Sequence, residues 1–187
     1  MTSFPALLFD LDGTLVDSIP DVCASVNLAL EDFGHNPITI DQAKSLVGHG
    51  ARVLIEKALH LGGTTLTDSE LDLLLEKFLS NYSQNPARFS AVFPGAREAL
   101  ERLCNAGIVL GICTNKPEAT TYPVLDVFDL EKYFKTIICG NTLAFRKPDP
   151  RHVYAVLDAM GFDKNEAALI GDSETDINAA LNAGFWL

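Results

Sequence analysis

Residues 6–14 read ALLFDLDGT, and this stretch decides how the rest of the chain is interpreted. A short, continuously apolar run followed by carboxylates and a glycine is typical of a buried parallel strand with polar groups at its carboxyl end. If the strand geometry persists to the tip, alternation places the side chains of Asp10 and Asp12 on the same side. Asp-Gly pairs also form ordinary turns, so this stretch alone leaves a turn and a functional site equally open.

Later parts of the chain alternate between strand-like and helix-like segments. Three runs are apolar, about the length of a strand, and followed by Thr, Asn, Gly or Asp: Ile108 to Cys113, Thr136 to Cys139 and Ala167 to Ile170. Three segments carry apolar residues at spacings of three and four and are predicted to be helices: Ala96 to Cys104, Pro117 to Phe128 and Arg151 to Met160. The alternation predicts an α/β fold with a doubly wound parallel sheet, which binds ligands beyond the carboxyl ends of its strands.

Residues 17–90 interrupt this alternation. They hold helical patterns and no convincing strand, and several Gly and Pro residues divide them. Thr67 followed by Glu70 is typical of a capping box that opens the last of these helices. We therefore expect an inserted helical domain at residues 17–90 and a Rossmann-like core made of residues 1–16 and 91–187.

Polar groups that suit phosphoryl transfer follow the later strands. Residues 114–116 (TNK) follow the second strand, Lys147 lies after the third, and Asp172 and Asp176 lie after the fourth. Phosphoryl transfer needs a nucleophile, a metal held by acids, and cationic or hydroxyl donors around the equatorial oxygens. Each group also has a plainer interpretation: a turn at 114–115, a solvated loop lysine at 147, and a capping box between Ser173 and Asp176.

Composition and charge exclude several classes of protein. The chain has 187 residues, with 14 Lys and Arg against 25 Asp and Glu, and its formal charge of −11 disfavours nucleic acid and anionic membranes as partners. A phosphate-ester substrate would therefore need a local cationic pocket. The four cysteines show no CxxC spacing and are expected to be reduced thiols, and the opening residues lack the features of a signal peptide. These features favour a cytoplasmic location for the protein.

Taken together, DLDGTLVDS (residues 10–18), TN (114–115), RKPDP (146–150) and GDSETD (171–176) resemble the four ordered motifs of haloacid dehalogenase-like hydrolases. The resemblance runs from about residue 5 to the end and implies a Rossmann-like core with an inserted helical cap. It implies that Asp10 is the nucleophile that forms an aspartyl-phosphate and that Asp12 is the general acid and base. Dehalogenase members of the family lack an acid at the position of Asp12, so a phosphatase is favoured.

The same resemblance implies the other residues of the site. Four groups would bind the transferring phosphate: Thr114, Lys147 and the backbone N–H groups of Gly13 and Asn115. The implied cofactor is Mg²⁺, with these ligands: Asp10, the backbone carbonyl of Asp12, and Asp172, supported by Asp176.

Within the family, VGHGAR (residues 47–52), FPGA, TNKP and RKPDP look like the phosphoglycolate phosphatases, which hydrolyse 2-phosphoglycolate to glycolate. The expected partner is thus a small phosphorylated metabolite, bound by a monomer or a homodimer. His49 or Arg52 is a candidate for contact with the glycolate carboxylate, against the alternative that both are solvated. Other phosphatases, a phosphosugar mutase with the same catalytic set, and an inactive member of the family remain alternative functions.

Two further expectations concern the surface and the end of the chain. His35, His60 and His152 suggest only surface positions. Residues 184–187 (GFWL) resemble the start of a fifth strand that stops at once, so a truncated edge of the sheet is expected beside Asp172, with lowered stability.

Overall fold

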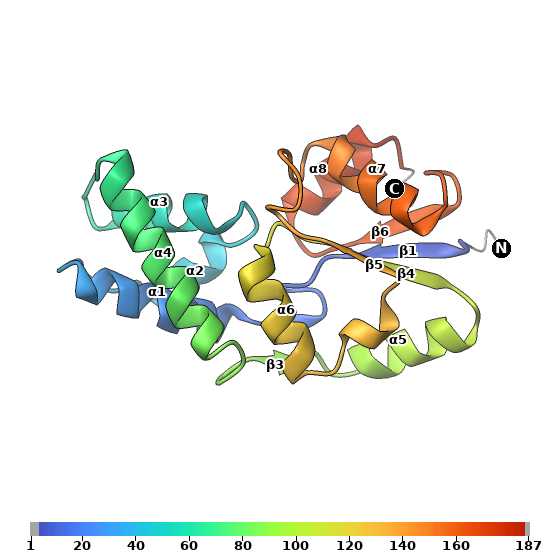
Figure 1. Ribbon diagram of the computed structural model, residues 1–187, viewed down its shortest axis with the longest axis horizontal. Helices are drawn as coiled ribbons and strands as arrows, with labels where there is room; N and C mark the ends of the chain where they lie inside the picture. Colours follow the sequence, from blue (N-terminus) through green and yellow to red (C-terminus); the bar gives the residue numbers. More distant parts are fainter. Residues whose placement is uncertain (1–3, 186–187) are drawn as a thin grey trace.

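The computed structural model describes residues 4–185, and its centre is a parallel sheet of four strands in the order β5-β4-β1-β6 (Figure 1). The strands are β1 (Ala6–Phe9), β4 (Val109–Cys113), β5 (Thr136–Ile138) and β6 (Ala167–Ile170). β1 lies between β4 and β6, with Ala6 opposite both Val109 and Ala167. All four predicted strands are confirmed, because runs buried on both faces are continuously apolar.

Helices cover both faces of the sheet, which confirms the doubly wound arrangement (Figure 1). One face carries α7 (Pro150–Met160) and α8 (Glu174–Asn182), and the other carries α5 (Ala96–Asn105), α6 (Glu118–Val127) and the 3₁₀ turn η1 (Glu131–Tyr133). Side chains of the strands point to both faces of the sheet: Leu8 packs with Val156 under α7, whereas Leu110 packs with Leu100 under α5. The sheet is thereby buried between two apolar layers.

Along the chain, four helices follow β1 before residue 91, and we call them the helical insertion: α1 (Ile19–Asp32), α2 (Ile40–Leu46), α3 (Ala51–Leu61) and α4 (Asp68–Gln84). They pack on one another, and α4 also packs on α6. Thr67 and Glu70 form the expected capping box at the start of α4. The chain passes between the core and these helices twice. The two connecting segments, β2 (Val16–Asp17) and β3 (Ala91–Val92), pair as a short antiparallel ribbon, which the sequence pattern did not predict.

Three sequence-based expectations can be compared directly with the structure. All four cysteines are free thiols, as expected. His152 is fully buried rather than exposed, because its ring packs between the Cys113 thiol and the Cys139 carbonyl. The strand start expected at residues 184–187 lies half outside the described residues, at 186–187. Of the other two residues, Gly184 lies in a turn, and Phe185 is buried without strand structure.

In the part of the chain that the structure describes, no helix has the length and apolar character needed to cross a bilayer.

Candidate active site

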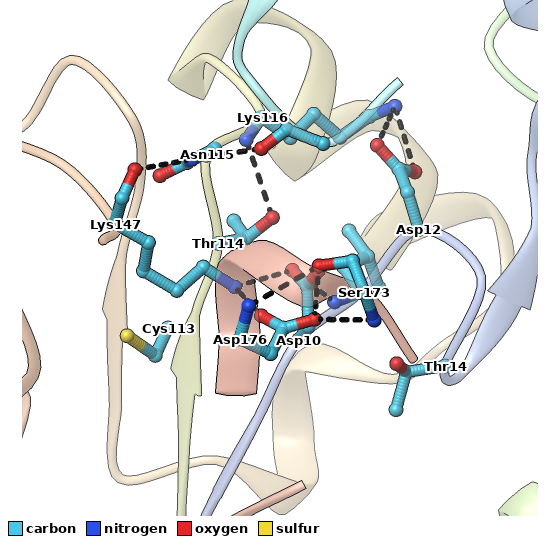
Figure 2. Close-up of polar contacts among 12 residues, drawn as sticks. Asp10, Asp12, Thr14, Cys113, Thr114, Asn115, Lys116, Lys147, Ser173 and Asp176 are labelled. Atoms are coloured by element: carbon cyan, nitrogen blue, oxygen red, sulfur yellow. Dashed lines mark hydrogen bonds and ion pairs between the residues drawn. The ribbon is translucent and has the colours of Figure 1, made fainter. Parts of the chain in front are cut away.

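Polar side chains from separate strands converge at one edge of the sheet. Asp10 directly follows β1, Thr114 follows β4, and Asp172 lies two residues beyond β6. Because the strands are parallel, these carboxyl ends meet at the same edge. The structure therefore brings together the core residues that the sequence singled out (Figure 2).

Asp10 is paired with a buried lysine. The Nζ atom of Lys147 lies 3.1 Å from Oδ1 of Asp10 and 2.6 Å from Oδ1 of Asp176 (Figure 2). Burial raises the pKa of Asp10 to about 6, although the positive charge of Lys147 acts to lower it. Burial also acts to lower the pKa of Lys147, but Asp10 and its other anionic neighbours outweigh that effect and raise it. Lys147 is thus a charged group of the site and not a solvated loop lysine.

Three carboxylates form a possible cation site. One oxygen from each of Asp10, Asp172 and Asp176 lies within 4.8 Å of the other two. Asp172 is exposed and accepts a hydrogen bond of 2.9 Å from the Thr14 hydroxyl. Gly13 makes this approach possible, because a Cβ atom there would lie 2.3 Å from Oδ2 of Asp172. A hard cation with oxygen ligands suits this donor set.

Asp176 has two roles at once. Its Oδ2 accepts hydrogen bonds from the backbone and hydroxyl of Ser173, at 3.1 and 2.6 Å, and forms the capping box that opens α8. Its Oδ1 accepts the hydrogen bond from Lys147. A Cβ atom at Gly171 would lie 2.3 Å from the Asp176 carboxyl carbon, so the glycine permits this packing. The capping interpretation and the functional one are therefore compatible.

Asp12 lies in different surroundings from Asp10. Its Oδ1 accepts a hydrogen bond of 2.5 Å from the Ser18 hydroxyl, and the Lys116 ammonium lies 3.0 and 3.1 Å from its two oxygens (Figure 2). Asp12 is partly exposed, whereas Asp10 is buried. Two carboxylates in unlike environments can take unlike chemical roles. The contacts of Lys116 and Ser18 with Asp12 were not predicted, because they join residues on different elements.

Thr114 and Asn115 lie beside these carboxylates and line the same cavity. The side chain of Asn115 donates hydrogen bonds of 2.8 Å to the carbonyls of Gly48 and Lys147, so it links the helical insertion to the core. Within residues 4–185, the backbone N–H groups of Asp12 and Asn115 donate to no hydrogen bond. The Gly13 N–H instead donates to the Val16 carbonyl at 2.9 Å, so this geometry does not support the predicted contact with phosphate.

A cavity of about 640 Å³ opens over the site. Its floor includes Asp10, Asp12 and Thr114, and its walls include apolar residues of the helical insertion such as Leu54 and Phe78. The core residues and the helical insertion thus enclose a space large enough for a small metabolite.

The two candidate specificity residues of the insertion do not line this cavity, although their neighbours Gly48, Gly50 and Ala51 do. His49 is exposed. Arg52 forms ion pairs with three carboxylates of the insertion: Glu56, Asp68 and Asp72. The geometry therefore assigns the Arg52 charge to contacts within the insertion.

Comparison with known proteins gives three kinds of match. The sequence profile of the family described as haloacid dehalogenase-like hydrolase matches residues 7–186. A protein of Agrobacterium fabrum named phosphoglycolate phosphatase is 43% identical over 179 residues, which cover 96% of this chain and 77% of that protein. A protein of the same name from Mesorhizobium japonicum is 41% identical over 184 residues, which cover 97% of this chain and 80% of that protein.

A solved structure has the same architecture. The crystal structure of a predicted phosphoglycolate phosphatase from Haemophilus somnus superposes with a TM-score of 0.93 at 33% identity. The superposition covers 99% of this chain and 84% of that one.

Proposed function

The chain belongs to the haloacid dehalogenase-like hydrolases, and on that premise we propose that it hydrolyses 2-phosphoglycolate to glycolate and phosphate. The observation that carries the phosphatase chemistry is the pair Asp10 and Asp12, two carboxylates at the end of β1 with different partners. The similarity to proteins named phosphoglycolate phosphatase, at up to 43% identity, supports the choice of substrate.

In the first half of the reaction, a carboxylate oxygen of Asp10 attacks phosphorus, and the bond from phosphorus to the ester oxygen breaks. Asp12 gives a proton to the departing oxygen, which leaves as the hydroxyl of glycolate. Lys147, whose ammonium lies beside Asp10, binds the phosphoryl oxygens together with the Thr114 hydroxyl and the N–H groups of Asp12 and Asn115, which have no partner within residues 4–185. The product of this step is an aspartyl-phosphate at Asp10.

In the second half, Asp12 takes a proton from a water molecule, and the resulting oxygen nucleophile attacks phosphorus. The bond between phosphorus and Asp10 breaks, inorganic phosphate forms, and the Asp10 carboxylate returns. Asp12 ends with the proton that it can give to the next leaving group. The hydrogen bond from Ser18 and the ion pair with Lys116 hold the Asp12 side chain at the cavity.

The cluster of Asp10, Asp172 and Asp176 fits a divalent cation, for which we propose Mg²⁺. The holding residues would be Asp10, Asp172 and the Asp12 backbone carbonyl, with Asp176 in support. The fit rests on three closely spaced oxygen donors, two of them on the buried carboxylates of Asp10 and Asp176, whose charge a cation would stabilise. When bound, Mg²⁺ supplies Lewis-acid stabilisation of the charge on the transferring phosphoryl group.

We assign residues 17–90 to a cap over the cavity and residues 1–16 and 91–187 to the catalytic core. The β2–β3 ribbon at the two crossings supports these boundaries. A cap that closes on a small substrate excludes water from the phosphoryl group. The free cysteines are consistent with a reducing cytoplasm as the site of the reaction.

The test is phosphate release from 2-phosphoglycolate, measured with and without Mg²⁺ beside an aryl phosphate, a phosphosugar and the variant Asp10→Asn. Selective, metal-dependent release that vanishes in the variant is expected. Release from the aryl phosphate or the phosphosugar alone would keep the chemistry and reject the substrate. A folded chain that releases nothing would point to an inactive member of the family.

A further inference from the structure

A second buried lysine lies at the site in addition to Lys147. The ammonium of Lys116 lies 3.0 Å from Oδ1 of Asp12 and donates a hydrogen bond of 2.9 Å to the Tyr82 hydroxyl. It also lies 4.3 Å from the centroid of the Tyr82 ring. Lys116 is 7% exposed and Tyr82 is fully buried, so the ammonium is held from two sides (Figure 2 shows the Asp12 contact).

The two buried lysines of the described chain belong to opposite halves of the reaction centre. Lys147 contacts Asp10, the proposed nucleophile, so its charge lies beside the phosphoryl group. Lys116 contacts Asp12, the proposed proton donor, so its charge lies beside the leaving group. The steps derived above use Lys116 only to hold Asp12, and burial of its ammonium carries a desolvation penalty that Asp12 and Tyr82 offset.

We infer that Lys116 binds the carboxylate of the leaving group and thereby selects a substrate whose alcohol carries an acid. This inference rests on the proposed function. If Asp12 protonates the ester oxygen, that oxygen lies within hydrogen-bond reach of the Asp12 carboxylate. In 2-phosphoglycolate the carboxylate carbon is two bonds beyond the ester oxygen, which brings its oxygens within reach of the Lys116 ammonium. A charge-assisted hydrogen bond there distinguishes an acid from a neutral group.

Tyr82 is the positioning residue for this contact. It belongs to α4 of the helical insertion, whereas Lys116 belongs to the loop after β4 of the core. Its ring and hydroxyl together hold the ammonium at Asp12. Because α4 packs on α6, the selecting cation is in place only when the insertion is docked on the core. Substrate selection and closure over the site are therefore linked through one residue pair.

Other cations near the cavity are weaker candidates. Arg52 is paired with three carboxylates, and His49 does not line the cavity. Lys44 of α2 does line the cavity but is exposed, so water competes for its charge. Lys44 therefore provides a matched control, since it is a cavity lysine outside the inferred contact.

The experiment compares kcat/KM for 2-phosphoglycolate and for 2-hydroxyethyl phosphate, which has a neutral leaving group of similar length. The ratio of the two values should fall roughly 10- to 150-fold in Lys116→Met, because a hydrogen bond to a charged group is lost for the acidic substrate alone. Lys116→Arg should restore part of the ratio. Lys44→Met should leave the ratio unchanged.

Equal losses for both substrates in Lys116→Met, or a collapse of the ratio in Lys44→Met, would overturn the inference. Tyr82→Phe is an independent test, since it keeps the ring and removes only the hydroxyl. It should raise the KM for 2-phosphoglycolate and leave the KM for 2-hydroxyethyl phosphate unchanged, and equal changes would contradict the positioning role. A wild-type chain without preference for 2-phosphoglycolate would instead refute the proposed function.

Discussion

The ammonium of Lys147 lies 3.1 Å from a carboxylate oxygen of Asp10, with 1% and 9% of the two side chains exposed. The same ammonium lies 2.6 Å from Asp176, so one buried cation holds two buried carboxylates together. Removing one member of such a group leaves uncompensated buried charge, which costs more than the intact group contributes. Lys147, for which we propose a role in phosphate binding, is therefore also part of what holds the edge of the sheet together.

We expect Lys147→Met to abolish phosphatase activity and to lower the free energy of unfolding by about 3–5 kcal/mol. Urea denaturation of the two proteins measures the second effect. Lys132→Met provides the control, because it removes an ion pair with Asp129 in which both side chains are about half exposed or more. That control should unfold like the wild type. An unchanged unfolding midpoint in Lys147→Met would show that the buried carboxylates do not depend on this lysine.

The pH dependence of stability should depend in part on His152. Burial lowers the pKa of His152 to about 4 from an ordinary value of 6.5, so the unfolded chain binds this proton more readily between those two values. Stability contributed by the neutral ring is therefore complete above pH 6.5 and is lost as pH falls towards 4, by roughly 3 kcal/mol in total. Because the Cys139 carbonyl can only accept, Nε2 carries the proton and Nδ1 accepts from the Cys113 thiol.

Chemical unfolding of the wild type and of His152→Gln from pH 7 to pH 4.5 measures this effect. Both proteins also contain titrating carboxylates, so the relevant quantity is the difference between their slopes of stability against pH. The wild type should lose stability more steeply. His60→Gln changes an exposed histidine and should keep the wild-type slope. Identical slopes for wild type and His152→Gln would contradict the assignment.

Asp21 connects the first helix, α1, to residues 89–90, where the chain returns from the helical insertion to the core. It is 2% exposed, and its carboxylate accepts hydrogen bonds from the backbone N–H groups of Phe89 and Ser90, at 2.9 and 2.7 Å, and from the Ser90 hydroxyl. Asp21→Ala leaves these partly buried donors without their acceptor and should lower the free energy of unfolding by roughly 1–3 kcal/mol.

Limited proteolysis should then cut the Asp21→Ala variant near residues 86–90 faster than the wild type. The comparison variant is Asp32→Ala, which removes an exposed ion pair with Lys77 and should cost less than about 1 kcal/mol. If Asp21→Ala and the wild type are cut at the same rate, contacts other than those of Asp21 hold residues 86–90 in place.

The sheet and the position of the carboxylates at its edge could be predicted from the sequence because both depend on local pattern. A strand buried on both faces must be continuously apolar, as residues 6–9 are, and the polar groups that follow it must lie at its carboxyl end. The contact between Lys116 and Tyr82 could not be predicted, since it joins a loop and a helix 34 positions apart. His152 was placed on the surface for the same reason: its burial depends on two residues of other elements.

At Gly13 the structure shows a requirement for space that the sequence motif alone did not predict. The resemblance to the family suggested that its N–H binds phosphate, but that N–H donates to the Val16 carbonyl at 2.9 Å. What the position requires is space: φ is +84°, and a Cβ atom would lie 2.3 Å from Oδ2 of Asp172. Gly13→Ala should therefore displace Asp172 and weaken the binding of the divalent cation.

We expect Gly13→Ala to lower kcat by roughly 10–100-fold at low Mg²⁺, with partial recovery as Mg²⁺ rises, since disturbing the position of a metal ligand weakens metal binding by about that factor. Gly107→Ala is the matched control, because its φ is +77° but a Cβ atom there would meet no atom of residues 4–185 within 4 Å. Both variants carry the same backbone strain, so both should lose similar stability on urea denaturation. Only Gly13→Ala should change the Mg²⁺ dependence of activity. If both variants change it equally, backbone strain and not the displacement of Asp172 would be the cause.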